Sequence, residues 1–267
     1  MAEDPSWISV GDLAAGFAPE SNILSPCHDL AGVDLKLVFE DGHEQNLLIE
    51  RRGDEQLITQ PGKDPVPVRV TSLRPDLYFV DYLADHHSIT LLVDRASGQV
   101  LRVVGAMPNA TETKKSLLSR AKEGLPLSAV KVVFEAAHIA GKPAQPGFER
   151  TTELVGKRIR YRYSQTELYE HIYLNDSFYT WHCISGVEAG LADTDLCHFY
   201  KLRDQLYLFV WQEKIVPTLG VVTIDLEKNK TDGKIFGHAD FEAGQFSNFS
   251  IGAYATIANY TPKPDIS

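Results

Sequence analysis

The chain has 267 residues, 43% of them hydrophobic and 10% aromatic, which supports the core of one large or two small domains. The formal net charge of −10 at pH 7 opposes binding to phosphate backbones, so no nucleic acid and no anionic membrane is expected as a partner. The acidic start leads into no apolar stretch and no run is long enough to span a bilayer, which predicts a cytoplasmic protein.

The first half of the chain has the pattern of antiparallel strands. Short runs alternate apolar and polar residues, as at Leu35, Leu37 and Phe39, and turn signals such as Asp41-Gly42 separate them. Alternation with a period of two, broken by such turns, predicts hairpins that are half buried on one face.

A single helix is predicted between the two halves. Asn109 can act as its N-cap, Glu112 can reach back to complete a capping box, and Gly124 followed by Pro126 would end it. Its apolar stripe is formed by Leu117, Leu118 and Ala121. We interpret this helix as a linker or a barrel lid.

The turn-rich loop 141–147 marks the expected domain boundary. It separates an N-terminal domain of residues 1–140, which includes the linker helix, from a C-terminal domain of residues 148–267.

Three segments of the first half recur in the second, which indicates an internal duplication. They are 30–39, repeated as 154–163, then 76–82, repeated as 205–211, and 93–105, repeated as 224–237. A repeated meander closes most economically into an up-and-down barrel, which leaves no free edges. The sequence therefore predicts a mainly β protein with two tandem antiparallel β-barrels and a short linking helix.

Polar and aromatic side chains gather on predicted inner faces of the second half. Tyr161 and Tyr163 are two apart on one strand, so both phenols project from the same face. Glu213 shares a strand face with Trp211, and a carboxyl group against an aromatic wall has its pKa raised, as a general acid near neutral pH requires. Alternatively, the tyrosines only line the sheet, and the strand ends at Trp211 with Glu213 in a solvated hairpin beside Lys214.

The duplication separates these alternatives. The first copy has Leu37 and Phe39 where the second has the two tyrosines, and Ala84 where the second has Glu213. If the first barrel is a scaffold, these polar replacements mark the C-terminal barrel as the working one.

Histidines and cysteines give no metal-binding pattern. Cys27, Cys183 and Cys197 are an odd number without C-x-x-C spacing, which is typical of reduced thiols. His182-Cys183 and Cys197-His198 are sequence neighbours on predicted strands, so only one residue of each pair can enter a common site. We therefore expect no metal and no cofactor.

Other polar residues have no assigned chemistry at this level. Tyr169, His171 and Tyr173 alternate on one strand and could line the same cavity. Asp193 and Asp195 could order a barrel mouth. The pair His86-His87 is interpreted as a surface turn. The motifs of serine hydrolases, P-loop proteins and dinucleotide-binding proteins are missing from the sequence.

Two family resemblances rest on these residues. The order Tyr161-x-Tyr163, Tyr169-Glu170, Asn175-Asp176, Ser185-Gly186 and Trp211-x-Glu213 resembles the bacterial phenolic acid decarboxylases, a small lipocalin-like family. The runs 169–175, 178–183, 191–195 and 217–221 resemble the MoaF family, named for molybdenum cofactor biosynthesis. No run resembles a pterin-binding or molybdenum-binding site, so the name of the MoaF family does not indicate a reaction.

The resemblance implies lipocalin-like barrels and roles for individual residues. The tyrosine pair would hold a substrate through its hydroxyls. His182 stands where the decarboxylases have an arginine, so the group best suited to clamp a carboxylate is replaced. The residues expected to contact the substrate beside the catalytic ones are Trp211, Tyr173 and Tyr169.

The functional hypothesis is a cofactor-independent lyase or isomerase acting on a small aromatic or conjugated substrate. Glu213 would donate a proton, Tyr161 and Tyr163 would bind a polar end, and His182 would orient the substrate or relay a proton. Decarboxylation of a hydroxycinnamate-like acid is what the resemblance implies. The alternatives are a non-catalytic small-molecule-binding protein and, third, a structural role. The sequence does not determine the oligomeric state, and a homodimer is one possibility.

Overall fold

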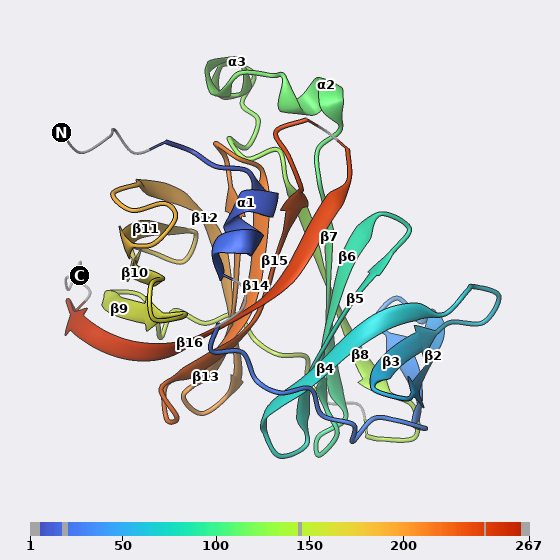
Figure 1. Cartoon of the computed structure of the whole chain (residues 1–267). Coiled ribbons are helices and arrows are strands. Elements are labelled where there is room, and N and C mark those ends of the chain that lie inside the picture. Colours follow the sequence, from blue (N-terminus) through green and yellow to red (C-terminus); the bar gives the residue numbers. More distant parts are fainter. Residues whose placement is uncertain (1–5, 18–20, 144–145, 243, 263–267) are drawn as a thin grey trace. The chain divides into compact units, whose positions relative to one another are not determined.

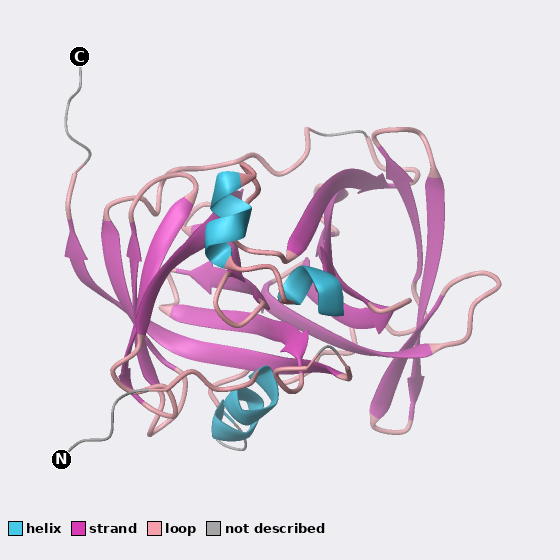
Figure 2. Cartoon of the chain, turned by 90° about the horizontal axis from the view of Figure 1, so that it is seen from above, coloured by secondary structure: helices cyan, strands magenta, loops and turns pink. Residues whose placement is uncertain are grey.

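The computed structural model describes residues 6–17, 21–143, 146–242 and 244–262. Antiparallel strands dominate this part of the chain, and its three helices are short (Figures 1 and 2). All three helices fall well short of the length that a bilayer crossing needs. Residues 144 and 145 of the predicted boundary loop lie outside the described residues.

The N-terminal sheet is a ring of eight strands in sequence order. Its strands are β1 (Asp34–Phe39), β2 (Glu44–Arg52), β3 (Glu55–Thr59), β4 (Val66–Arg74), β5 (Leu77–Ala84), β6 (His87–Asp94), β7 (Gln99–Ala106) and β8 (Lys131–Ile139). The ring returns to its start where β8 pairs with β1, with Leu37 opposite Ile139. Leu37 and Phe39 lie in its apolar core, against which Ala84 packs, as the sequence predicts.

The C-terminal sheet is a closed antiparallel barrel. Its strands are β9 (Lys157–Arg162), β10 (Leu168–Tyr173), β11 (Phe178–Ser185), β12 (Ala192–Arg203), β13 (Leu206–Glu213), β14 (Thr218–Asp225), β15 (Lys230–His238) and β16 (Phe246–Tyr260). Strand β9 closes the barrel because it pairs with both β10 and β16. Every residue of β14 is buried, and so is every residue of β13 except the last, Glu213, which is half-buried.

The two sheets correspond strand for strand, which confirms the predicted pair of barrels. Even their irregularities match: the register shifts between Ser72 and Arg74 in β4, and between Lys201 and Arg203 in β12. The turns that follow place Asp76 and Gln205 at positive φ, 64° and 51°. Shared irregularities of this kind are what an internal duplication leaves behind.

The prediction of a single linking helix is wrong, because the segment forms two short helices. The capping box of Asn109 and Glu112 is present, but helix α2 (Ala110–Thr113) is only one turn long. Ser116 then caps a second helix, α3 (Leu117–Lys122), because its side chain accepts a hydrogen bond from the amide of Ser119. Neither helix has a buried residue, so the apolar stripe does not pack into a core.

Helix α1 (Val10–Phe17) was not predicted. Its first turn is closed by Ser9, whose hydroxyl accepts a hydrogen bond from the amide of Asp12 at 3.1 Å. It packs on β15 and β16 (Figure 1) and buries Val10, Leu13 and Phe17.

The compact units of the chain do not follow its two sequence halves. One unit contains the C-terminal barrel together with the described residues of 1–23 and of 107–131. The other contains residues 24–106 and the described residues of 132–149. The linking helices and α1 therefore belong to the unit of the C-terminal barrel.

Candidate functional site: an enclosed acidic and aromatic cavity

A small cavity of about 30 Å³ lies inside the C-terminal barrel. Strands β10, β11, β13 and β15 line it, and helix α1 completes its wall through Leu13 and Phe17. Most of the wall is aromatic, and two carboxyl groups face the space, those of Glu188 and Glu213. No Lys or Arg lines the cavity in the part of the chain that the structure describes.

Glu213 occupies the position that the sequence predicts. Strand β13 continues to Glu213, which pairs with Thr218, so the alternative of a solvated hairpin is wrong. The indole Nε1 of Trp211 donates a hydrogen bond of 2.8 Å to Oε1 of Glu213. Burial raises the pKa of the Glu213 carboxyl well above its usual value, and the charges of Asp195 and Glu188 raise it further. The raised pKa favours the protonated form of the group, which can donate a proton.

Glu188 is a second cavity carboxyl, and sequence reasoning missed it. It lies between β11 and β12 and accepts a hydrogen bond of 3.0 Å from the hydroxyl of Tyr169. Burial raises the pKa of Glu188 as well. Because two carboxylates in one enclosed space repel each other, the pair favours a state with one proton retained. A loop residue has no strand periodicity, so no sequence pattern pointed to it.

The two tyrosines of the predicted pair have different environments. Tyr163 lines the cavity, where burial and the nearby charge of Glu213 raise its pKa. No hydrogen-bond partner of its hydroxyl is found among the described residues. Tyr161 is fully buried beside it and shares a hydrogen bond of 2.6 Å with the hydroxyl of Tyr173. Tyr161 and Tyr173 therefore form a packed pair, while Tyr163 offers a free phenol to the cavity.

The predicted convergence of His182 with these groups is wrong. Trp181 points into the barrel, so the next residue on β11 faces outward, and the His182 side chain is 43% exposed. Its Nδ1 lies 4.0 Å from Glu170, a carboxylate that already pairs with Arg158 at 2.6 Å. His182 is part of an ionic cluster on the outer face.

The histidine inside the barrel is His171. It lies on β10 between the aromatic side chains of Tyr161 and Tyr179, with ring centroids 4.7 and 5.1 Å away. Burial lowers the pKa of His171 to about 3, so its imidazole is neutral near pH 7. It can donate or accept a hydrogen bond there, but it does not supply a positive charge.

Asp193 and Asp195 support the site rather than line it. Trp181 donates a hydrogen bond of 3.0 Å from its Nε1 to Asp195, just as Trp211 does to Glu213. Lys214 pairs with Asp193 at 2.5 Å and with Asp195 at 3.3 Å. The aspartates order the barrel end through these side chains, and they fix the orientation of one tryptophan of the wall.

The described part of the chain contains no group of three His, Cys, Asp or Glu side chains arranged to hold a metal ion. Cys27, Cys183 and Cys197 are all free. Burial raises the pKa of the Cys183 thiol to about 11, so it is protonated at neutral pH.

The fold and this cavity define a class of protein: a tandem pair of eight-stranded β-barrels in which the second barrel encloses an aromatic cavity with two protonatable carboxyl groups. The chain belongs to the MoaF family. The MoaF N-terminal domain matches residues 5–109, and the MoaF C-terminal domain matches residues 148–261. The protein MoaF of Klebsiella aerogenes is 43% identical over 265 residues, which cover 98% of each chain.

A solved structure with a more distant similarity comes from Nostoc punctiforme, a protein of unknown function from the DUF3598 family. It covers 84% of this chain and 94% of its own, with 12% identity and a TM-score of 0.34.

Proposed function

We propose that the protein is a cofactor-independent lyase or isomerase that works by general acid and base chemistry in the C-terminal barrel. The observation that carries this proposal is the Glu213 carboxyl group, held by Trp211 in an aromatic cavity with Glu188 as a second acid. Two carboxyl groups that share an enclosed space divide into one acid and one base more readily than solvated ones. Glu213 donates the proton, and Glu188 accepts one.

The other polar groups of the cavity suit a developing oxyanion. The phenol of Tyr163 has no hydrogen bond among the residues described, and burial raises its pKa, so it remains a donor. Tyr169 faces the same space from β10, with its hydroxyl donated to Glu188. A phenol donor that is already in place, as that of Tyr163 is, stabilises charge that appears on a carbonyl or phenolate oxygen of the substrate.

The charge of the cavity favours a neutral substrate. With two acids and no Lys or Arg among the described residues of the wall, a carboxylate substrate would be repelled rather than held. Decarboxylation of a hydroxycinnamate-like acid remains what the motif order implies. The position of His182 outside the barrel favours isomerisation, elimination or hydration of a neutral conjugated molecule instead.

Substrate entry requires the cavity to open, because about 30 Å³ has room for water but not for an aromatic ring. Helix α1 is the part of the wall best suited to move, since it lies outside the hydrogen-bonded barrel. The amide of Gly11 donates to the carbonyl of Ala239 at 2.9 Å, and Val10, Leu13 and Phe17 are buried against the barrel. We propose that α1 shifts when a ligand binds.

The test uses the full-length protein and a panel of conjugated phenols, enones and phenolic acids, followed by mass spectrometry. Loss of carbon dioxide appears as a mass decrease, and isomerisation as a retention shift at constant mass. With a converted compound in hand, Glu213→Gln is expected to lower turnover by roughly two to four decades, the usual contribution of a positioned acid. The matched control is Glu55→Gln, at an exposed residue of β3, which should leave turnover unchanged. Equal turnover of Glu213→Gln and wild type would falsify the acid role.

A non-catalytic small-molecule-binding protein is the second candidate. It is favoured by the absence of any charged imidazole in the cavity, since His182 is outside and His171 is neutral. The two candidates differ in the fate of the ligand. A compound that binds the C-terminal barrel and is recovered unchanged by wild type supports the binding protein.

A further inference from the structure

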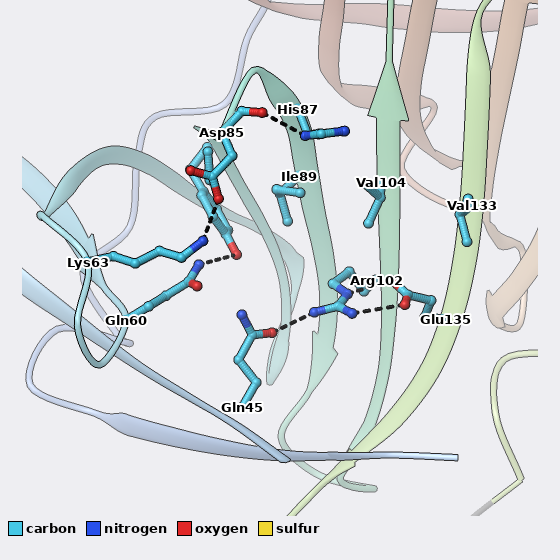
Figure 3. A pocket seen from close by; sticks show the side chains of 12 residues that line it. Gln45, Gln60, Lys63, Asp85, His87, Ile89, Arg102, Val104, Val133 and Glu135 are labelled. Carbon is cyan, nitrogen blue, oxygen red and sulfur yellow. Dashed lines mark hydrogen bonds and ion pairs between the residues drawn. The ribbon is translucent and has the colours of Figure 1, made fainter. Parts of the chain in front are cut away.

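The N-terminal barrel has a pocket of about 340 Å³, which is larger than the cavity of the C-terminal barrel and within the range of small-molecule sites. Figure 3 shows the side chains that line it. Side chains from β2, β5, β6, β7 and β8 line it. The sequence assigned this barrel a scaffold role, because its core positions are apolar. The pocket shares Tyr82, Ala84 and Ile89 with that core and adds polar side chains to them.

Arg102 forms the fixed polar centre of the pocket. Its guanidinium donates two hydrogen bonds to Glu135, at 2.6 and 2.9 Å, and a third to Gln45 at 2.7 Å. It also lies 4.0 Å from the centre of the Phe39 ring. The Arg102 side chain is only 15% exposed. Glu135 is 32% exposed, so the ion pair is partly buried. Such a pair adds little net stability compared with apolar packing, which is compatible with a role in recognition.

The rim of the pocket carries further polar groups that are mutually neutralised. Lys63 is paired with Asp85, and Gln60 donates a long hydrogen bond of 3.5 Å to the hydroxyl of Tyr82. Burial raises the pKa of Tyr82 to about 12, so its phenol stays protonated and can donate. Lys63 and Arg102 each face a carboxylate. His87, the other basic residue of the lining, places its Nδ1 2.8 Å from the carbonyl oxygen of Asp85. The Lys and Arg charges are therefore balanced within the pocket, which favours a neutral ligand over an ionic one.

One side of the pocket is apolar. Ala84, Ile89, Val104 and Val133 lie along it, and Figure 3 shows the last three in a row beside the polar group of Gln45 and Arg102. Val133 is 54% exposed at the edge of this apolar side. A ligand that covers it would remove this apolar surface from water.

We propose that this pocket is a second ligand site, which binds a neutral, ring-sized molecule with hydroxyl or carbonyl groups on one edge and an apolar opposite edge. The polar edge meets the amides of Gln45 and Gln60 and the phenol of Tyr82. The apolar edge packs on Ile89, Val104 and Val133. This site lies in the other barrel from the proposed catalytic cavity and does not depend on its chemistry.

The test is a charge series on one ring, followed by nitrogen-resolved NMR of the labelled full-length protein. The probes are 4-hydroxybenzyl alcohol, 4-hydroxybenzoate and 4-hydroxybenzylamine. The neutral alcohol is expected to shift the side-chain amides of Gln45 and Gln60, and to bind at least tenfold more tightly than either charged probe. If no probe shifts these signals, or if a charged probe binds more tightly than the alcohol, the proposal is overturned.

Two variants locate the binding. Val104→Phe fills the pocket and should weaken binding of the alcohol at least tenfold. Tyr82→Phe keeps the shape and removes one donor, so a loss of roughly two- to tenfold is expected. Glu213→Gln is the control in the other barrel and should leave these shifts unchanged. Unaltered affinity of both pocket variants, with wild-type spectra elsewhere, would show that the probe binds at another place.

Discussion

Burial of carboxyl groups without a cation couples the stability of the C-terminal barrel to pH. The folded state raises the pKa of Glu213 above its unfolded value, so both states hold the proton at low pH. As the pH rises through the unfolded pKa, only the unfolded state releases the proton. Stability is therefore complete below about pH 4.3 and is lost above it, by at most about 1.4 kcal/mol per pH unit for one group.

Glu213→Gln should remove this pH dependence. The glutamine amide keeps an oxygen for the Trp211 indole and has no proton to lose. We expect the variant to match wild type near pH 4 and to exceed its free energy of unfolding progressively between pH 5 and pH 8. Urea unfolding across this range measures the difference. A difference that stays constant with pH would mean that Glu213 is ionised in the folded protein.

Removal of the hydroxyl should affect stability at Tyr161 and ligand affinity at Tyr163. Tyr161→Phe breaks a buried hydrogen bond and leaves the hydroxyl of Tyr173 with only a distant partner, His171 at 3.5 Å. It should cost about 1 kcal/mol or more of stability. Tyr163→Phe removes a hydroxyl that bonds to no described residue, so stability should change little while affinity for a cavity ligand falls. Thermal unfolding and ligand titration of both variants separate the two roles. Equal stability losses would contradict this assignment.

The sequence predicted Glu213 for a sound physical reason and His182 for a weak one. Strand alternation from Trp211 fixes the side on which Glu213 lies, and the duplicated copy with Ala84 shows that an acid there is not needed for the fold. His182 came only from its place in a motif order. Alternation on β11 sends Trp181 and His182 to opposite faces, and the larger aromatic ring takes the interior. Glu188 lies in a loop, where no periodicity reports the direction of a side chain.

At the scale of elements, the strands were predictable and the short helices were not. Hairpins leave a period of two between turn residues, and this signal is local. Helix α1 has eight residues, two of them glycine, and so lacks the length and propensity to form alone. Packing against β15 and β16 stabilises this helix. The split between α2 and α3 depends on one local bond of Ser116, which competes with continuation of the helix.

The close packing of α1 predicts an effect opposite to helix propensity. A Cβ at Gly11 would lie 2.3 Å from the carbonyl oxygen of Ala239, and backbone there cannot easily yield. Gly11→Ala should therefore loosen α1, although alanine is favoured in an isolated helix by about 1 kcal/mol. Hydrogen exchange of residues 10–17 measures the effect.

Ala15→Gly serves as the propensity control for this helix, because Ala15 is exposed. If packing dominates the stability of α1, hydrogen exchange of residues 10–17 is faster in Gly11→Ala than in Ala15→Gly. Slower exchange in Gly11→Ala than in wild type would mean that α1 is held by helix propensity instead.

At the scale of the whole molecule, we predict that structure and activity persist in a chelator. The sequence has no ligand set with zinc-like spacing, and the described residues bring none together in space. Elemental analysis of the purified protein, before and after chelation, checks this. A stoichiometric amount of zinc or iron that is lost together with folding would contradict it.

The sequence predicted two barrels and assigned the linking helix and the first residues to the N-terminal domain, whereas the described residues of 1–23 and of 107–131 belong to the unit of the C-terminal barrel. Periodicity reports the local conformation of a segment, whereas membership of a unit depends on the sheet that its side chains meet. Residues 10–17 bury their apolar face on β15 and β16, far along the chain. Segment 107–131 likewise joins the C-terminal unit through Gln212, which donates to the carbonyl of Val130 at 2.7 Å.

The distribution of tryptophan makes the two units optically distinct. Trp7, Trp181 and Trp211 all belong to the unit of the C-terminal barrel, and Trp181 and Trp211 line its cavity. The described part of the other unit contains tyrosine, at Tyr78 and Tyr82, but no tryptophan. Selective excitation of indole therefore reports the C-terminal unit, and two of its three emitters line the cavity. A ligand that quenches this emission in wild type but not in a variant that fills the cavity is an occupant of the second barrel, so the protein has its own fluorescent label for that site.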